Sequence, residues 1–367
     1  FTSLALLSFC LCSSLMAETI MVSSALDIQN EMNDLAPGDT LMLTNGVWID
    51  QHISLHAVGT EANPIVLIAE TPGQVILTGH SYLFMSGEYI EVNGLNFSEG
   101  YETGSAIVEF RRAGIRANNC RLTNTSFFNY NPTSISSNYK WVSMYGRNNR
   151  VDHCYFAGKN HDGTTLVVWL SEEQDRDNHH VIEYNYFGYR PPLGFNGGET
   201  IRIGTSTWSM TNSRTIVRHN VFEQCDGEIE IISNKSCENI YFNNTFINNE
   251  GMLTLRHGER CVVDGNFFLG NGNDEAGGVR IIGADHVITN NYFQDLQGDG
   301  YRSALVFVKG VQDSPLNRYF QVENALVAHN TLINCKQSFL MGYGGSSDQT
   351  LPPINCTIAN NAVYSWG

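Results

Sequence analysis

One short pattern of apolar and polar positions recurs along most of the chain. A β-branched residue is followed by a short stretch, an Asn and an aromatic or aliphatic pair, as in Ile216-Val-Arg-His-Asn220-Val-Phe222. Other copies end at Leu95, Phe187, Phe246, Phe268, Phe293, Leu332 and Val363. The Asn residues at positions 220, 244, 266 and 291 are 24, 22 and 25 residues apart. A period of roughly 20–50 residues predicts a solenoid or a repeat array.

The local pattern indicates which solenoid to expect. The repeated segments are short, β-branched and aromatic, which predicts strands, and no helical period of adequate length separates them. A propeller is excluded because its blades need roughly 40 residues or more. We therefore expect an all-β protein, a right-handed parallel β-helix with about three short strands per coil. The repeated Asn should stack at a turn, itself in the left-handed conformation, and the aromatic residue two positions later should stack in the core.

The two ends of the predicted solenoid differ. Apolar residues at positions 26, 28, 32 and 35 predict an amphipathic helix over Ser24–Leu35, which would cover the open end of the first coil. The segment Ala36-Pro-Gly-Asp39 should end it, and Thr40–Thr44 should begin a strand. No such cap follows the last repeat, because the sequence stops at Trp366-Gly367, so we expect a truncated C-terminus. The β-helix domain is assigned to residues 18–367.

Residues 1–17 carry no charge and resemble the apolar part of a secretory signal peptide. An N-terminal membrane anchor is the alternative, but the apolar run is shorter than the roughly 20 residues that a spanning helix needs. We therefore expect a secreted or periplasmic protein with no membrane segment after signal removal. Seven Cys follow residue 17, widely spaced and without a CxxC pair, which favours small core residues over disulfides or a zinc site.

Charge limits the partners. The chain has 21 Lys and Arg against 37 Asp and Glu, a net charge of −16, which argues against nucleic acid. Binding of any polyanion must then depend on local cations or a bound metal. Insertions in solenoids map to loops, often on the binding face. We expect groove walls at four long excursions between coils: Asn124–Tyr145, His161–His180, Tyr189–Gly197 and Gln297–Phe320.

The segment Glu228-Ile-Glu230-Ile carries two carboxylates at strand spacing. Alternation places Glu228 and Glu230 outside and both isoleucines, Ile229 and Ile231, in the core. Adjacent carboxylates repel unless a cation lies between them, and Ca²⁺ prefers oxygen ligands. The preceding Gly-rich loop could add the amide oxygen of Asn196. The alternative is a solvated pair bonded to Arg202 or Arg280.

Two cations should lie beside these carboxylates. Lys235 follows Glu230 by five residues, and Arg256 follows Lys235 by 21 residues, close to one coil. A Lys crowded by Arg and a divalent cation has its charged form disfavoured, so Lys235 could act as a base near neutral pH. An ion-pair ladder along the solenoid surface is the alternative interpretation.

Three segments resemble the motifs of polysaccharide lyase family 6, which groups alginate lyases with chondroitinase B. They are Asn196-Gly-Gly-Glu-Thr-Ile-Arg-Ile-Gly204, Glu228-Ile-Glu-Ile-Ile-Ser-Asn-Lys-Ser236 and Leu255-Arg-His-Gly258. The resemblance covers essentially the whole mature chain and is closer to the alginate lyases. It implies that Ca²⁺ is held by Asn196, Glu228 and Glu230, that Lys235 is the base and that Arg256 is the acid.

This resemblance implies β-elimination on alginate, which leaves a 4,5-unsaturated uronate, with dermatan sulfate as the alternative substrate. His257 and Arg280, on neighbouring coils, are candidate substrate contacts. A glycoside hydrolase could use Glu228 and Glu230 but leaves Lys235 without a role. A non-catalytic carbohydrate-binding β-helix would bind without turnover, and a C5-epimerase would begin with the same proton abstraction.

Overall fold

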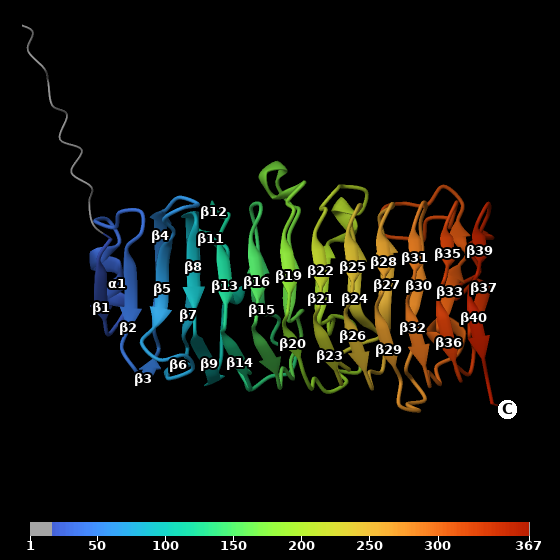
Figure 1. Cartoon of the computed structure of the whole chain (residues 1–367), viewed down its shortest axis with the longest axis horizontal. Coiled ribbons are helices and arrows are strands. Elements are labelled where there is room, and N and C mark those ends of the chain that lie inside the picture. The colour runs from blue at the N-terminus through green and yellow to red at the C-terminus, as the bar shows by residue number, and fades with distance from the viewer. Residues whose placement is uncertain (1–16, 367) are drawn as a thin grey trace, which may run out of the picture.

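Short apolar strands wind around one core and pair with the equivalent strands of the next coil. The computed structural model describes residues 17–366, and the coils stack along one long axis with α1 (Ala25–Glu31) at the N-terminal end (Figure 1). Three parallel sheets run the length of this stack. The predicted parallel β-helix is therefore confirmed, with one strand of each sheet in a typical coil. The predicted signal peptide, apart from Ala17, lies outside the described residues.

The strands of each sheet follow in spatial order. Sheet 1 contains β1 (Thr19–Val22), β2 (Thr40–Leu43), β5 (Ile65–Ala69), β8 (Ile90–Asn93), β13 (Arg121–Thr123), β16 (Arg150–Asp152), β19 (Val181–Glu183), β22 (Ile216–Arg218), β25 (Ile240–Phe242), β28 (Val262–Asp264), β31 (Val287–Thr289), β35 (Leu326–Ala328) and β39 (Thr357–Ala359). Sheet 2 contains β3 (Gly46–Ile49), β6 (Val75–Gly79), β9 (Leu95–Gly100), β14 (Ser126–Phe128), β17 (Tyr155–Ala157), β20 (Tyr186–Phe187), β23 (Val221–Glu223), β26 (Thr245–Ile247), β29 (Phe267–Leu269), β32 (Tyr292–Gln294), β36 (Thr331–Ile333) and β40 (Ala362–Tyr364).

Sheet 3 carries the residues discussed below. It contains β4 (His52–Val58), β7 (Tyr82–Glu88), β10 (Ala106–Glu109), β15 (Lys140–Met144), β18 (Leu166–Val168), β21 (Ile201–Gly204), β24 (Glu230–Lys235), β27 (Met252–His257), β30 (Val279–Ile281), β33 (Leu305–Val308) and β37 (Phe339–Tyr343). A hairpin of β11 (Arg111–Arg112) and β12 (Ile115–Asn118) joins it through β7, and β34 (Gly310–Val311) pairs with β38 (Gln349–Leu351) apart from it.

Buried Asn side chains form a ladder between sheets 1 and 2. Each Nδ2 donates to the Oδ1 of the Asn in the next coil, as from Asn220 to Asn244 at 3.0 Å and from Asn244 to Asn266 at 3.0 Å. The same oxygens also accept a backbone N–H, such as that of Asn220 at 3.1 Å. The predicted stack is confirmed.

The conformation predicted for these Asn residues is wrong. The left-handed residue is the one before each ladder Asn, for example Asn243 with φ 53° and His219 with φ 54°. The turn is made at that exposed position, so the ladder Asn can point inward at the start of the next strand. Gly265 fills the same position before Asn266 with φ 64°.

The core behind the ladder is aromatic. Phe rings stack from Phe97 to Phe293 in successive coils, with centroids 4.6–5.1 Å apart. The predicted stack two residues after the Asn is confirmed. The seven Cys of the described chain are free thiols, and five of them are buried, as expected for small core residues.

The N-terminal helix is shorter than predicted. Ser24 caps it by accepting the N–H of Asp27 at 3.1 Å, and Ile28 is buried in the core. Leu26, expected on the apolar face, is 63% exposed. Met32 and Leu35 pack against the core from the turn that follows the helix. No helix within residues 17–366 has the length and apolar character needed to cross a membrane.

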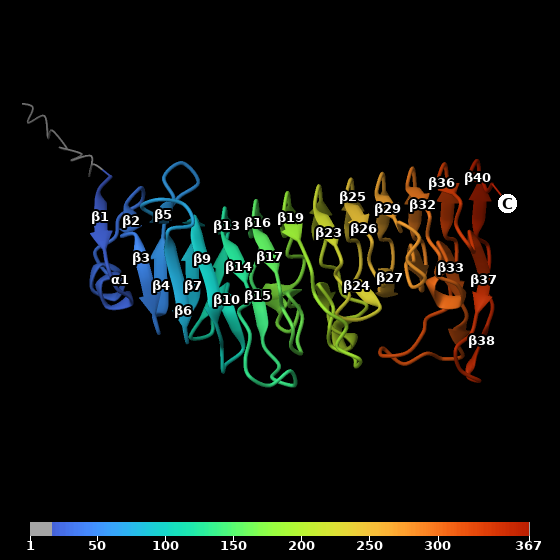
Figure 2. The same ribbon diagram turned by 90° about the horizontal axis from the view of Figure 1, so that it is seen from below.

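Three of the four predicted excursions contain coil strands. Asn124–Tyr145 contains β14 and β15, His161–His180 contains β18, and Gln297–Phe320 contains β33 and β34, whereas Tyr189–Gly197 contains no strand. These strands have two to five residues, too few for alternation to be recognised, which explains the error. Loops extend from one side of the stack in Figure 2, among them the orange segment beside β38.

We predict that Asn244→Ala lowers the free energy of unfolding by about 3 kcal/mol, because it leaves the buried N–H and amide of Asn220 without an acceptor. Denaturant unfolding measures this. The matched control is Asn243→Gly, at the exposed left-handed position next to it, which should change stability by less than about 0.5 kcal/mol. Equal losses of stability in the two variants would contradict the claim that the buried Asn ladder stabilises the fold.

Candidate active site

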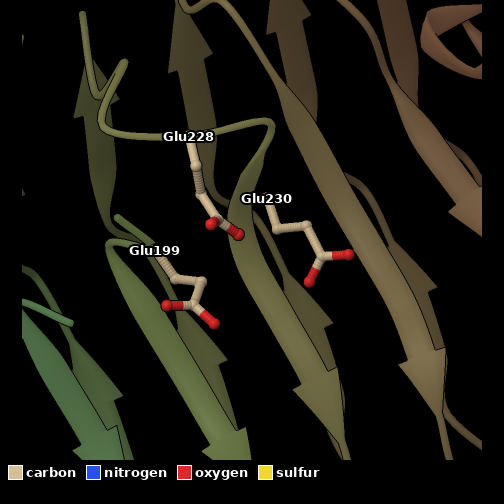
Figure 3. Close-up of side chains that lie close together, drawn as sticks. All are labelled: Glu199, Glu228 and Glu230. Atoms are coloured by element: carbon tan, nitrogen blue, oxygen red, sulfur yellow. The ribbon is translucent and has the colours of Figure 1, made fainter. Parts of the chain in front are cut away.

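Three carboxylates meet on the outer face of sheet 3. Glu199 precedes β21, Glu228 lies in the turn before β24, and Glu230 begins β24. One oxygen from each lies within 4.8 Å of the others (Figure 3). Such a cluster of hard oxygen donors could hold a metal ion. Glu199 was not predicted, although it belongs to the Gly-Gly-Glu-Thr motif, because its position next to Glu230 depends on the register between coils.

The strand that carries Glu230 is irregular. It begins at Glu230 rather than Glu228, and its pairing with β27 shifts between Glu230 and Ile232. Ile231 enters the main core as predicted, but Ile229 does not. It packs instead in a second apolar cluster with Met252, so the strict alternation expected here is wrong.

Burial and mutual repulsion govern the electrostatics of the cluster. Burial, reinforced by Glu199 and Glu230, raises the pKa of Glu228 to about 7. Burial also acts to raise the pKa of Glu230, but Arg280, Lys235 and the hydroxyl of Ser233 outweigh it, so that the pKa is lowered. A positive charge bound beside Glu228 would therefore stabilise its ionised form.

Asn196 lies beside Glu228, in the loop that precedes Glu199. The N–H of the next residue, Gly197, donates to Glu228 Oε2 at 2.8 Å. Asn196 and Glu228 line the same cavity of about 370 Å³. The Asn196 side chain is exposed and makes no hydrogen bond within residues 17–366. Its role as a metal ligand therefore stays a prediction.

Lys235 ends β24 on the same face. Its Nζ lies 3.4 Å from Glu199 Oε1, and its side chain is only 16% exposed. The sequence predicted Arg256 and a divalent cation beside Lys235. The direct partner that the structure shows is the carboxylate of Glu199, which was not predicted. Lys235 is less exposed than the sequence suggested.

Arg256 is held in place by a loop. Its Nε lies 4.0 Å from Glu230 Oε1, as the one-coil spacing predicted. On the other side, its Nη1 donates to the carbonyl of Arg318 at 3.1 Å, and the guanidinium lies 4.2 Å from the ring centre of Tyr319. Burial lowers the pKa of Arg256. The segment Gln297–Phe320, predicted as a groove wall, thus reaches the site, although Tyr319 itself was not predicted.

The two candidate substrate contacts are both buried. His257 is 1% exposed, its Nε2 lies 3.2 Å from Ser206 Oγ, and burial lowers its pKa to about 3, so the ring is neutral. Arg280 is 9% exposed and bonds Glu230 directly. The sequence also allowed that Arg202 or Arg280 pairs with the two carboxylates. Arg280 does pair with Glu230, whereas the guanidinium of Arg202 lies over the ring of Trp169.

Comparison with known proteins assigns the chain to a family. The family model described as chondroitinase B matches residues 22–365. The chain belongs to polysaccharide lyase family 6. Within this family, the structure of the alginate lyase AlyGC has 42% sequence identity and a TM-score of 0.90, covering 92% of this chain and 47% of that chain. The chain thus spans about half the length of that relative.

Two other lyases of family 6 are similar over most of both chains. A mannuronic acid specific enzyme from human gut microbiota has 32% identity and a TM-score of 0.84, covering 94% of this chain and 82% of that chain. A polysaccharide lyase from Pseudopedobacter saltans has 29% identity and a TM-score of 0.84, covering 95% and 85%. A comparison with curated proteins gives no match.

We predict that Arg280→Leu destabilises the protein by about 3–5 kcal/mol, because it leaves the buried Glu230 carboxylate without its direct partner. Thermal unfolding in the presence of chelator measures this without help from a metal. Arg260→Leu is the control: its ion pairs with Glu238 and Glu259 are solvent-exposed, and its loss should cost less than about 1 kcal/mol. A loss of stability in Arg280→Leu as small as that in Arg260→Leu would show that other groups compensate the charge of Glu230.

Proposed function

We propose that this chain is a calcium-dependent polysaccharide lyase that cleaves alginate by β-elimination. The observation that carries the proposal is the placement of Lys235 and Arg256, on two paired strands, beside the three-carboxylate cluster. The similarity to alginate lyases of family 6 supports the substrate.

Asn196, Glu228 and Glu230 would hold the ion, with Glu199 as a further oxygen donor. Carboxylate and amide oxygens suit Ca²⁺. Lys235 pairs with Glu199, and Arg256 and Arg280 pair with Glu230, whereas Glu228 forms no ion pair within residues 17–366. A bound calcium ion would neutralise the uronate carboxylate and so make the neighbouring C5 proton easier to remove.

The residues of the chain then carry the proton transfers. Lys235 removes the C5 proton, and the C5–H electron pair forms the C4=C5 double bond while the C4–O4 bond breaks. Arg256 donates a hydrogen bond to O4, and a proton reaches the leaving oxygen from Arg256 or through water. The carbonyl of Arg318 and the ring of Tyr319 fix the orientation of Arg256. The product is a sugar with a 4,5-unsaturated uronate at its non-reducing end.

Other functions make different predictions. Dermatan sulfate is the second candidate substrate because the matching family description is chondroitinase B. A hydrolase would release reducing ends without unsaturated product, a C5-epimerase would invert C5 without chain cleavage, and a binding protein would do neither. Absorbance of unsaturated product with poly-guluronate, poly-mannuronate and dermatan sulfate in parallel separates a lyase from the other three functions and identifies its substrate. We expect alginate to be cleaved faster than dermatan sulfate. A secreted or periplasmic location, as the leader predicts, would suit a polymeric substrate.

Metal removal is the first test. Excess chelator should abolish formation of unsaturated product, and Ca²⁺ should restore it better than Mg²⁺, which requires stricter octahedral geometry. Glu228→Gln should weaken Ca²⁺ binding in calorimetry. Full activity in excess chelator would refute the metal assignment.

Substitution of Lys235 tests the base. Lys235→Ala should lower kcat by about 10²- to 10⁴-fold with the fold intact. Lys235→Arg should not restore it, because a guanidinium remains protonated near neutral pH. Circular dichroism and binding of alginate check folding and affinity. Near wild-type turnover by Lys235→Arg would mean that another residue is the base.

A further inference from the structure

A buried arginine lies beneath the turns that carry the three-carboxylate cluster. Arg190, in the loop between β20 and β21, is 2% exposed and forms no ion pair within residues 17–366. Burial lowers its pKa to about 10, so the guanidinium remains charged at neutral pH. A buried charge without a carboxylate partner is costly unless hydrogen bonds satisfy it, and the partners of Arg190 therefore indicate its role.

The guanidinium of Arg190 joins two successive turns of the solenoid. Its Nη2 donates to the carbonyls of His161 and Gly163, each at 2.9 Å, in the turn before β18. Its Nη1 donates to the carbonyl of Glu199 at 2.8 Å, in the turn before β21. The same carbonyl accepts the N–H of Thr165 at 3.2 Å. Two donors therefore fix the backbone from which the Glu199 carboxylate extends.

The backbone of Arg190 extends this connection to the turn that carries Glu228. Its N–H donates to the carbonyl of Gln224 at 2.9 Å, and its carbonyl accepts the N–H of Asp226 at 2.9 Å. Gly227 then lies directly against the guanidinium, because a Cβ added there would be 2.6 Å from Arg190 Nε. Glycine is needed at this position for that close approach. One residue thus contacts the turns that precede both β21 and β24.

We propose that Arg190 is a positioning residue that sets the spacing of the metal-binding carboxylates. This inference rests on the proposed function and deepens it. Glu199 and Glu228 repel each other when they are ionised, and turns that were free to move would separate them. Arg190 opposes this separation because it is bonded to both turns. It acts through the backbone and touches neither the ion nor the sugar.

The chemistry of the side chain suits this role. A guanidinium offers several N–H donors in a planar fork, so it can hold three carbonyls at fixed angles, whereas an ammonium is a point charge on a flexible stem. Only the planar group can therefore transmit a fixed geometry from one turn to the next. Replacement of Arg190 by Lys separates this geometric role from the role of the buried charge.

A second buried cation provides a matched control. Lys159 is 1% exposed, and its Nζ lies 3.2 Å from the carbonyl of Tyr139 and 3.3 Å from that of Asp162. Its remaining partner in the described chain is His161. Lys159 therefore resembles Arg190 in burial and in bonding to carbonyls, but its hydrogen bonds do not reach the turns before β21 and β24.

The test measures Ca²⁺ binding without substrate, at a temperature where circular dichroism shows each variant to be folded. Arg190→Lys should raise the calorimetric Kd for Ca²⁺ about 10- to 100-fold. The Ca²⁺ concentration that gives half-maximal formation of unsaturated product should rise by the same factor. Lys159→Met should lower stability and leave this Kd unchanged, because partial unfolding reduces the number of binding sites and not their affinity. Should Arg190→Lys fail to fold, Arg190→Gln, which keeps two N–H donors, replaces it with the same expected result.

Hydrogen exchange of the metal-free protein gives an independent measurement. The amides of residues 194–200 should exchange faster in Arg190→Lys than in the wild type, and at the wild-type rate in Lys159→Met. If the wild type binds no Ca²⁺ and forms no unsaturated product, the proposed function fails. If the wild type does both, a wild-type Kd in the Arg190 variant refutes the positioning role. An equal loss of affinity in Lys159→Met also refutes it, because removal of any buried cation would then explain the effect.

Discussion

The buried amides that stack from Asn185 to Asn361 hold each coil in register with the one before. Each amide satisfies a side-chain and a backbone partner in the neighbouring coil, so sliding by one residue would leave several buried polar groups unpaired. This constraint makes distance in sequence a reliable measure of position in space. Lys235 and Arg256 meet because the ladder fixes the coil between them at 22 residues, the separation of Asn244 and Asn266.

The fixed register between coils also holds three carboxylates close together, although they repel one another. Glu199, Glu228 and Glu230 come from two adjacent coils and could not separate without breaking the strand pairing that carries them. Arg280 and Arg256 from the next two coils compensate Glu230 only, which leaves Glu228 with a raised pKa. The rigid solenoid thus maintains an electrostatic imbalance that a bound cation would relieve.

Much of this was predictable from the sequence. The Asn period and the Phe two residues later are strong signals, because each repeat must fill the same place in the stack. The left-handed residue before the Asn was missed because Tyr, His, Asn and Gly all occupy it and no single residue type marks it. Glu199 and Tyr319 were missed because their partners are in other coils, and the spacing there depends on loops of variable length. Ile229 was misplaced because alternation assumes a regular strand.

The irregular pairing of β24 and β27 has a consequence of its own. Pairing shifts once between Glu230 and Ile232 and again between Asn234 and Lys235, with the extra residue first on β24 and then on β27. The two shifts cancel, so Glu230 pairs with Met252 and Lys235 with His257 at the same sequence separation. The irregular pairing is therefore confined to the segment from Glu230 to Lys235 and its partners on β27. The pairings of β21 with β24 and of β27 with β30 keep a regular register. A solenoid that can absorb such a paired insertion locally can acquire or remodel a reactive surface on one coil without altering the register of the others.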